Sequence, residues 1–433
     1  MPDIPREKSF DSTLAFLREG YRFISNRCDR LNTDIFSTRI TLTPVICLRG
    51  ADAAGMFYGE DRFTRHGAMP KMTLRLLQDE GSVQALDDEA HRQRKRMFMG
   101  MMSDEAIAGI AVVFADEWRR ALSRWENDGE VKMHDAVGNV LTRTALRWTG
   151  VPLAKEDIPR RKSELMAMIE NAGSFGPSHI RARFQRRTAE RWAADLIRTV
   201  RKGGIVIQDA APLARIAHHR DIGGYQLADD IAAVELLNLL RPIVAIGRFI
   251  VFAALALHRH PLWRERFAKG DLDDLEPFVQ EVRRHSPFFP VIGGRVRKAF
   301  TWRGYAFPEG HWVLLDLYGT NHDSRIWPEP GVFRPERFRN WPGDPNTLVP
   351  QGAGSFATGH RCPGERITIK LLKEAVRLMC QEMRYEVPAQ DLTVELRCMP
   401  ALPRSKFVIG NVKRTKGGAE RMRTRLTLAA MSG

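Results

Sequence analysis

The chain has 433 residues, of which 43% are apolar and 27% are charged, values that are ordinary for a globular protein with a large hydrophobic core. Five cysteines are too few, and an odd number, for a disulfide framework, and the polar start MPDIPREKSFDST lacks the apolar stretch of a signal peptide, so we expect a protein of the reducing cytoplasm. The formal net charge of +15 favours either anionic partners or a solvated basic surface, but no nucleic-acid-binding signature accompanies it, and no apolar run predicts a transmembrane segment.

Helical periodicity dominates the chain, with a few short strands. Strand patterns occur at residues 41–48 together with 56–58, at 300–307 and at 313–315. Helical patterns occur at residues 184–201, 226–258, 273–285 and 364–385. Residues 321–354 form an irregular segment rich in Pro, Gly, Trp and Asn, and a loop of that length usually has a function. We predict a mainly α fold with small β-sheets, in one domain of residues 1–410 followed by a basic C-terminal extension, residues 411–433.

One cysteine stands in a glycine-containing loop, FATGHRCPGE (residues 356–365), directly before a predicted helix. A thiolate is a soft metal ligand, and the backbone N–H groups at a helix start favour its negative charge. No second Cys or His lies at zinc-ligand spacing. The loop therefore predicts either an axial ligand of heme iron, at Cys362, or a buried and inert cysteine.

Two further motifs precede this loop. Glu281 and Arg284 lie one helical turn apart, a spacing at which a carboxylate and a guanidinium stabilise a helix. The run FRPERF (333–338) brings Arg337 into the irregular segment. Together they predict a charge network of Glu281, Arg284 and Arg337 that pins this segment and supports the cysteine loop.

These three motifs, in this order, resemble those of the cytochrome P450 superfamily, and the resemblance covers nearly the whole chain. It implies the P450 heme-thiolate fold and a heme b whose iron is bound by Cys362. In that family the Glu-x-x-Arg pair and the downstream arginine are structural supports, which implies the same for Glu281, Arg284 and Arg337.

The resemblance also implies residues that bind the heme carboxylates. His91 and Lys95, at i and i+4 on one predicted helix, resemble the family's propionate-binding helix, and Arg295 resembles another propionate site. The cysteine loop is one residue shorter than usual before the cysteine. Its basic propionate-binding residue is therefore His360 when aligned from the cysteine and Arg361 when aligned from the preceding glycine.

The helical pattern ELLNLLRPIVAIGRF contains an Arg-Pro pair. Pro242 has no backbone N–H, which predicts a kink that opens room beside it. Arg241 is a cation among aliphatic residues, which is costly unless an anion pairs with it. A ligand with a carboxylate head and an alkyl tail meets both conditions. The alternative is a protein partner, Glu235 or Asp230, although neither lies three or four residues from Arg241.

P450 enzymes that activate O₂ usually carry an acid–alcohol pair where this chain has Arg241-Pro242. The pair, with the cysteine loop, resembles the bacterial fatty acid peroxygenases. That resemblance implies a long-chain fatty acid and hydrogen peroxide as substrates, with no reductase required. Arg241 would bind the fatty acid carboxylate, which then acts as general acid–base, and Pro242 would shape the pocket.

Two other segments resemble pocket segments of this family. SVQALD (82–87) places Gln84 where decarboxylating members tend to have His, and because Gln cannot titrate we expect hydroxylation. Phe175, in AGSFGP (172–177), would limit the depth of the alkyl chain and favour hydroxylation at Cα over Cβ. The alternatives are a reductase-dependent O₂ monooxygenase, a decarboxylase that forms terminal alkenes, a heme- or fatty-acid-binding protein without turnover, and a basic nucleic-acid binder.

Overall fold

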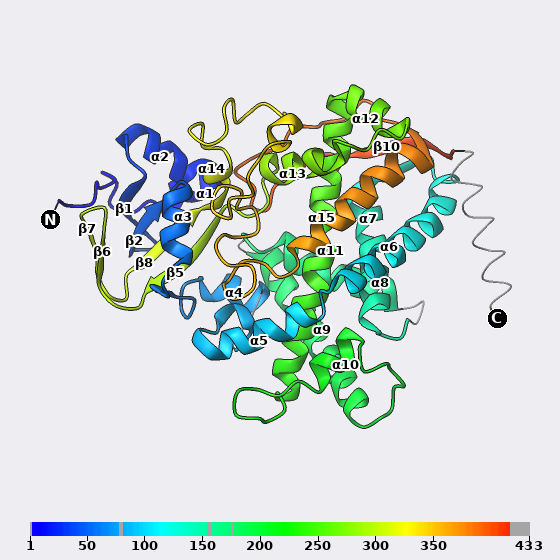
Figure 1. The fold of residues 1–433 in the computed structure, drawn as a ribbon, viewed down its shortest axis with the longest axis horizontal. Helices are drawn as coiled ribbons and strands as arrows, with labels where there is room; N and C mark the ends of the chain where they lie inside the picture. Colours follow the sequence, from blue (N-terminus) through cyan, green and yellow to red (C-terminus); the bar gives the residue numbers. More distant parts are fainter. Residues whose placement is uncertain (1, 78–80, 154–156, 175, 416–433) are drawn as a thin grey trace.

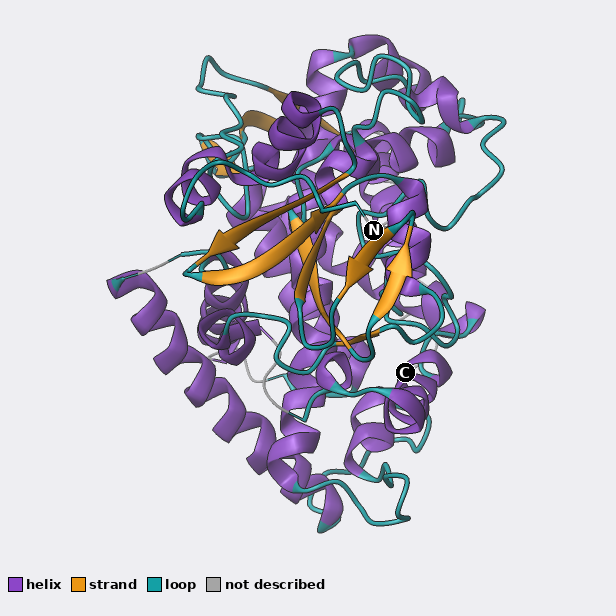
Figure 2. Ribbon diagram, turned by 90° about the vertical axis from the view of Figure 1, so that its left-hand side faces the viewer, coloured by secondary structure: helices purple, strands orange, loops and turns teal. Residues whose placement is uncertain are grey.

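Helices form most of the computed structural model. The main sheet lies at the end of the molecule where the N-terminal segment lies, and the last strand of the chain lies at the opposite end (Figures 1 and 2). The structure describes residues 2–77, 81–153, 157–174 and 176–415. The α-helices are α1 (Thr13–Glu19), α2 (Phe23–Leu31), α3 (Ala51–Tyr58), α4 (Lys71–Leu77), α5 (Asp88–Gly100), α6 (Asp104–Trp125), α7 (Met133–Thr149), α8 (Asp157–Glu170), α9 (Pro177–Arg201), α10 (Pro212–Ala217), α11 (Asp229–Arg259), α12 (Pro261–Ala268), α13 (Leu275–His285), α14 (Leu317–Asn321) and α15 (Glu365–Arg377). Short helical turns are η1 (Gly20–Arg22), η2 (Val83–Ala85), η3 (Pro335–Phe338) and the π-helical η4 (Leu378–Glu382).

The main sheet has the strand order β1-β2-β8-β5-β3. Strand β2 pairs with β8 in parallel, and the other neighbours are antiparallel. A second sheet has the order β4-β10-β9, and β6 and β7 form a separate hairpin. The strands are β1 (Ile35–Ile40), β2 (Thr43–Leu48), β3 (Phe63–Thr64), β4 (Glu130–Lys132), β5 (Val291–Val296), β6 (Phe300–Trp302), β7 (Tyr305–Phe307), β8 (Trp312–Asp316), β9 (Met383–Glu386) and β10 (Val408–Arg414).

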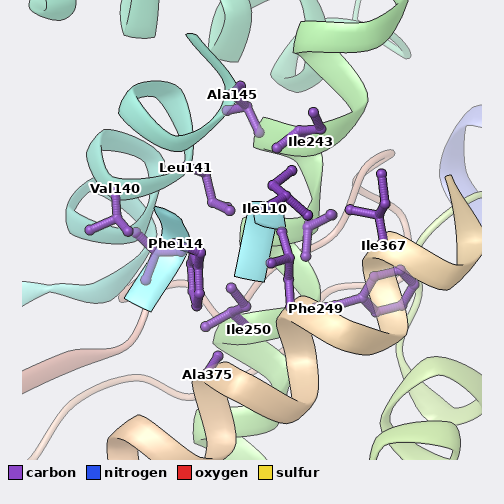
Figure 3. Packing of buried hydrophobic residues seen from close by; sticks show 14 of the residues in the cluster. Ile110, Phe114, Val140, Leu141, Ala145, Ile243, Phe249, Ile250, Ile367 and Ala375 are labelled. Atoms are coloured by element: carbon purple, nitrogen blue, oxygen red, sulfur yellow. The ribbon is translucent and has the colours of Figure 1, made fainter. Parts of the chain in front are cut away.

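Helix α11 is the centre of the largest hydrophobic cluster. Leu141 of α7, Phe114 of α6 and Ile367 of α15 pack around it, as Figure 3 shows. The helix is long and apolar enough to cross a membrane, but 89% of its most apolar window is buried in the protein, which is typical of the core helix of a globular domain.

The predicted elements agree with the structure in kind, with two corrections. Residues 56–58 are the end of helix α3 and not a strand, because Ala53, Ala54, Met56 and Phe57 form its buried face. The helix predicted at 364–385 ends earlier: α15 stops at Arg377, and residues 383–385 belong to β9, where side chains alternate between buried and exposed. Strand β10 continues to Arg414, four residues into the segment predicted as a basic extension, and residues 416–433 lie outside the described residues.

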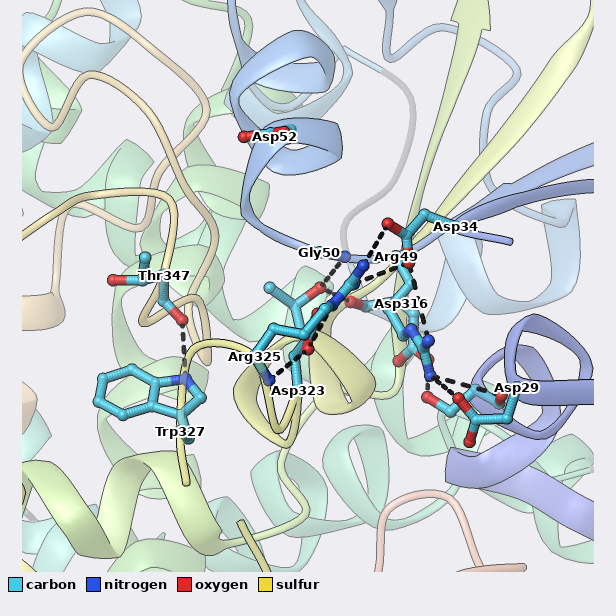
Figure 4. A network of polar contacts seen from close by, with 12 residues as sticks. Asp29, Asp34, Arg49, Gly50, Asp52, Asp316, Asp323, Arg325, Trp327 and Thr347 are labelled. Atoms are coloured by element: carbon cyan, nitrogen blue, oxygen red, sulfur yellow. Dashed lines mark hydrogen bonds and ion pairs between the residues drawn. The ribbon is translucent and has the colours of Figure 1, made fainter. Parts of the chain in front are cut away.

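The irregular segment between α14 and the cysteine loop is bound to the N-terminal part of the chain by ion pairs (Figure 4). Both Nη atoms of Arg325 donate to Asp34 at 2.7 Å, and its Nε donates to Asp323 at 2.9 Å. Nearby, Arg49 donates to Asp29 at 2.6 Å. A bidentate pair of this kind fixes orientation as well as distance, so the long segment has a defined path.

The other anchor of this segment is the predicted network around Glu281. The fully buried carboxylate accepts from Nε and Nη2 of Arg284 at 2.6 and 2.8 Å and from the backbone N–H of Arg334 at 2.8 Å. Arg337 Nε lies 3.3 Å from the same carboxylate. Arg284 also donates to the carbonyl of Asn321 at 2.9 Å, so the network joins α13 to the start and the middle of the segment.

We expect Glu281→Gln to lower the free energy of unfolding of the heme-loaded protein by about 3–5 kcal/mol, because it leaves buried guanidinium groups without a counter-ion. Chemical denaturation measures the change. Glu329→Gln is the matched control, since Glu329 pairs with Arg334 in the same segment but both side chains are exposed, and its effect should stay within about 1 kcal/mol. Equal effects of the two substitutions would contradict a stabilising role for the network.

Candidate active site

The thiol of Cys362 lies at the entrance of helix α15. The backbone N–H of Cys362 donates to the carbonyl of Gln351 at 3.0 Å, and Nε2 of Gln351 lies 3.7 Å from the cysteine sulfur. Burial raises the pKa of the thiol, while hydrogen bonds from the Gly364 N–H and from Gln351 oppose that rise. A thiolate here has donors ready for it but needs a nearby positive charge, which a metal ion would supply.

A second arginine of α13, which the sequence pattern did not single out, holds this loop. Arg283 is 1% exposed and donates through Nη2 to Oε1 of Gln351 at 3.1 Å, with a further bond to Glu365. Gln351 in turn donates to Thr368 at 3.1 Å. The Glu281 network is therefore the support of the irregular segment, and its neighbour Arg283 is the support of the cysteine loop. The only sequence signal was a second arginine next to Arg284.

The two candidates for the basic residue of the loop, Arg361 and His360, have different partners in the structure. Arg361 donates through Nε and Nη2 to Glu365, at 2.6 and 3.1 Å, one turn along the chain. His360 instead stacks on His91 of α5, with ring centroids 3.9 Å apart. Arg361 thus already has a carboxylate partner, whereas His360 faces the helix predicted to bind propionates.

Helix α5 brings two predicted residues to the loop. Lys95 is 2% exposed and donates from Nζ to the carbonyls of Gly359, at 2.7 Å, and Arg361. Burial lowers the pKa of Lys95 to about 8. Burial, followed by the charges of Lys95 and Arg65, lowers the pKa of His91 to about 4.

Arg65 was missed in the sequence, whereas Arg295 was predicted there as a propionate-binding residue and stays a prediction. Burial and then the Arg65 charge lower the pKa of His360, which shows that this guanidinium lies close to the stacked imidazoles. Arg65 donates to the carbonyl of Gly293 at 2.6 Å. Arg295 lies on β5, paired with Thr64, the residue before Arg65. It donates to the carbonyls of Gly67 and Gly310 at 2.8 and 3.1 Å.

On the other side of the site, Arg241 of α11 is 7% exposed. Nη2 lies 3.5 Å from Oδ1 of Asn238, a contact at the limit of hydrogen bonding, and Nε has no hydrogen-bond partner among the described residues. Burial, then the charge of Arg186, lowers the pKa of Arg241 to about 9, whereas Cys362 raises it. The considered pairing with Glu235 or Asp230 does not occur: Glu235 pairs with Arg94 at 2.6 Å, and Asp230 is exposed.

Helix α11 runs without a break through Pro242. Between residues 232 and 257 every residue is buried except Pro242 and Ala245, which share one face of the helix. Pro242 directly follows the buried Arg241, so this partly exposed face is the part of the helix centre that a ligand could reach.

Gln84 lies in η2, and its Oε1 is buried without a hydrogen-bond partner in the described part of the chain. The preceding residue, Val83, donates its backbone N–H to Glu235 of α11 at 2.8 Å, which places this loop against the helix that carries Arg241. Phe175 lies outside the described residues.

These residues fit a heme. Cys362, with two donors directed at its sulfur, would bind the iron, and the gathered His91, Lys95, His360 and Arg65 would bind the two propionates. The open face at Pro242 and Ala245 would border the opposite side of the ring.

Comparisons with known proteins agree with this site. The sequence profile of the cytochrome P450 family matches residues 270–407. Among curated proteins, rhazimal synthase of Alstonia scholaris is 32% identical over 31% of this chain and 30% of its own length, and cytochrome P450 1A2 of Felis catus is 30% identical over 31% and 29%. The chain thus spans about a third of these relatives.

Solved structures match almost the whole chain. Cytochrome P450EX alpha (CYP152N1) with myristic acid is 41% identical with a TM-score of 0.92, and the match covers 96% of this chain and 100% of that one. Cytochrome P450SP alpha (CYP152B1) in complex with an ibuprofen enantiomer is 45% identical, with 93% and 99% covered and a TM-score of 0.91. An OleT variant in complex with arachidonic acid is 34% identical, with 96% and 99% covered and a TM-score of 0.93. The chain therefore belongs to the cytochrome P450 superfamily of heme-thiolate oxidoreductases.

Proposed function

We propose that this P450 is a fatty acid peroxygenase, which uses hydrogen peroxide to hydroxylate a long-chain fatty acid at Cα or Cβ. The observation that carries the proposal is the Arg241 guanidinium, buried on an aliphatic helix with one weak hydrogen bond to a neutral amide. The similar structures P450EX alpha and OleT contain myristic and arachidonic acid, which supports the same class of ligand here.

The charge of Arg241 selects for an anionic head group. A buried guanidinium without a counter-ion is unfavourable, and a bidentate carboxylate restores both its charge balance and its missing hydrogen bonds. The residues around it on α11, Leu240, Ile243 and Val244, are buried and aliphatic, so the rest of a ligand beside them must be apolar. A fatty acid has both properties.

The same arrangement supports substrate-assisted proton transfer. Heme, when bound, supplies the iron at which the peroxide O–O bond is broken and oxygen is transferred. Arg241 stays charged and Pro242 has no titratable group, so the pair that lies on α11 cannot supply the acid. A carboxylate held by Arg241 can take a proton from one peroxide oxygen and return it to the other. On this proposal the enzyme needs neither a protein acid nor a reductase.

The loop residue Gln84 supports hydroxylation over decarboxylation. Its amide is buried, does not titrate, and lies in the turn whose backbone is bonded to α11. The five free cysteines, three of them buried, are consistent with the cytoplasmic location that we propose.

The direct test uses the purified, heme-loaded protein with myristic or palmitic acid and hydrogen peroxide, without reductase or reduced nicotinamide, and identifies the products by mass spectrometry. A 2- or 3-hydroxy acid is the expected product and fixes the position of attack. Product only with an added reductase would assign a monooxygenase, a terminal alkene a decarboxylase, and a spectral shift without product a binding protein.

Arg241→Ala should lower peroxide-driven turnover by about 100-fold or more while heme stays bound, because the substrate carboxylate loses its anchor and its general acid–base role. Steady-state turnover and heme content are measured together. Arg248→Met is the matched control, since Arg248 is also buried on α11 but donates to the carbonyl of Ala401. Persistent turnover in Arg241→Ala would exclude catalysis by the bound carboxylate.

Gln84→His should raise the yield of terminal alkene at the expense of hydroxy acid, because an imidazole at this position can titrate and donate a proton. Gas chromatography of the products from one fatty acid gives the ratio. An unchanged ratio would show that residue 84 does not control the outcome.

A further inference from the structure

Glu235 is a fully buried carboxylate on α11, the helix that carries Arg241. It accepts hydrogen bonds from three different elements: the Val83 N–H of η2 at 2.8 Å, Arg94 Nη1 of α5 at 2.6 Å and Asn238 Nδ2 of its own helix at 3.1 Å. Its side chain is 0% exposed. Burial raises the pKa of this carboxyl, and Arg94 opposes the rise.

Each of the three donors leads to a residue of the proposed site. Val83 precedes Gln84, and Arg94 precedes Lys95, which is bonded to the cysteine loop. Asn238 accepts the weak contact from Arg241. One carboxylate therefore joins the loop, the helix α5 and the substrate-binding arginine.

Contacts run from Arg94 through Glu235 and Asn238 to Arg241, and the order of charges along them leaves Arg241 without a counter-ion among the described residues. Arg94 neutralises Glu235, and Asn238, which is uncharged, stands between Glu235 and Arg241. Because Asn238 gives its N–H₂ to Glu235, its carbonyl oxygen must face Arg241, so the guanidinium is oriented but not neutralised. Its Nε is left without a partner.

We propose that Glu235 is a positioning residue for fatty acid binding. It fixes the amide of Asn238 with the oxygen toward Arg241, while its pairing with Arg94 keeps the internal negative charge one residue away from the substrate carboxylate. This inference rests on the proposed function, since it concerns the site that would bind a fatty acid.

Moving the negative charge from position 235 to position 238 tests the proposal. In the double variant Glu235→Gln/Asn238→Asp, the new amide can still accept from Val83 and Arg94 and can donate to the new carboxylate, which can accept from Arg241. The net charge and the number of hydrogen bonds are kept, but the carboxylate now stands at position 238, directly beside Arg241. We expect this variant to retain heme and to bind myristic acid about 100-fold more weakly, because two carboxylates compete for one guanidinium.

Binding is followed by calorimetry on the heme-loaded protein with myristic acid and, as a neutral ligand of the same length, myristyl alcohol. The affinity for the alcohol should change little. Unchanged affinity for the acid in the folded double variant, or an equal loss for acid and alcohol, would overturn the inference. If the double variant does not retain heme, Asn238→Asp alone also places a carboxylate beside Arg241 and should give the same selective loss.

A second measurement separates positioning from stability. Glu235→Gln forces Asn238 to turn its N–H₂ toward Arg241, so KM for the fatty acid should rise more than kcat falls and the ratio of 2- to 3-hydroxy acid should change. Glu117→Gln is the matched control: Glu117 is also buried and paired, with Arg120, Arg143 and Arg147, but between α6 and α7. The same kinetic change in both variants would overturn the inference. Failure of the unchanged enzyme to prefer acid over alcohol would instead overturn the proposed function, and this inference with it.

Discussion

The unneutralised positive charge of Arg241 is the constraint on which the distal half of this P450 depends. Such a charge is costly in an apolar core unless an anion pairs with it, so the fold must hold Arg241 rigidly in place against that cost. Helix α11 supplies that rigidity, because α6, α7 and α15 pack around it and bury nearly all of its central residues. The exceptions, Pro242 and Ala245, lie on one face, so the helix is partly exposed directly after the charge that it buries.

The proximal half depends on a different arrangement. Here the thiol of Cys362 and the carboxylate of Glu365 lie close to several positive groups, and residues from distant segments hold them in place. Arg283 reaches the cysteine loop from α13, and Lys95 reaches it from α5. Because α5 also carries Arg94, which pairs with Glu235, the two halves are mechanically joined through one helix.

Motifs of local spacing could be predicted from the sequence, and contacts between distant segments could not. Cys362, the Glu281–Arg284 pair and the Arg241-Pro242 pair stand within short patterns whose residue types restrict their chemistry. Arg65, Gln351 and Arg283 were missed because only the folded chain brings them to the loop.

The wrong predictions have equally physical reasons. Residues 56–58 are apolar enough for a strand, but the alanines before them complete the buried face of a helix. Residues 383–385 continue an apolar pattern, but their pairing with β10 overrides it. The sequence could not choose between Arg361 and His360 as the basic residue of the loop. In the structure Glu365, one turn away, pairs with Arg361 and not with His360.

A comparison of two arginines on α11 explains why the site should prefer carboxylates to neutral chains. Arg248 is buried as deeply as Arg241, and burial lowers the pKa of both. Tyr21, and after it Glu170, partly reverse the lowering of the pKa for Arg248. For Arg241 the largest influence after burial is another cation, Arg186, which lowers its pKa further, and Cys362 opposes this. Neither arginine forms an ion pair with a described residue, but Arg248 donates to the carbonyl of Ala401 at 2.5 Å, whereas Arg241 has only the long contact with Asn238. On the proposed function an incoming carboxylate would supply the missing counter-ion and a neutral head group would not, so the desolvation that makes Arg241 costly would also be the source of its selectivity.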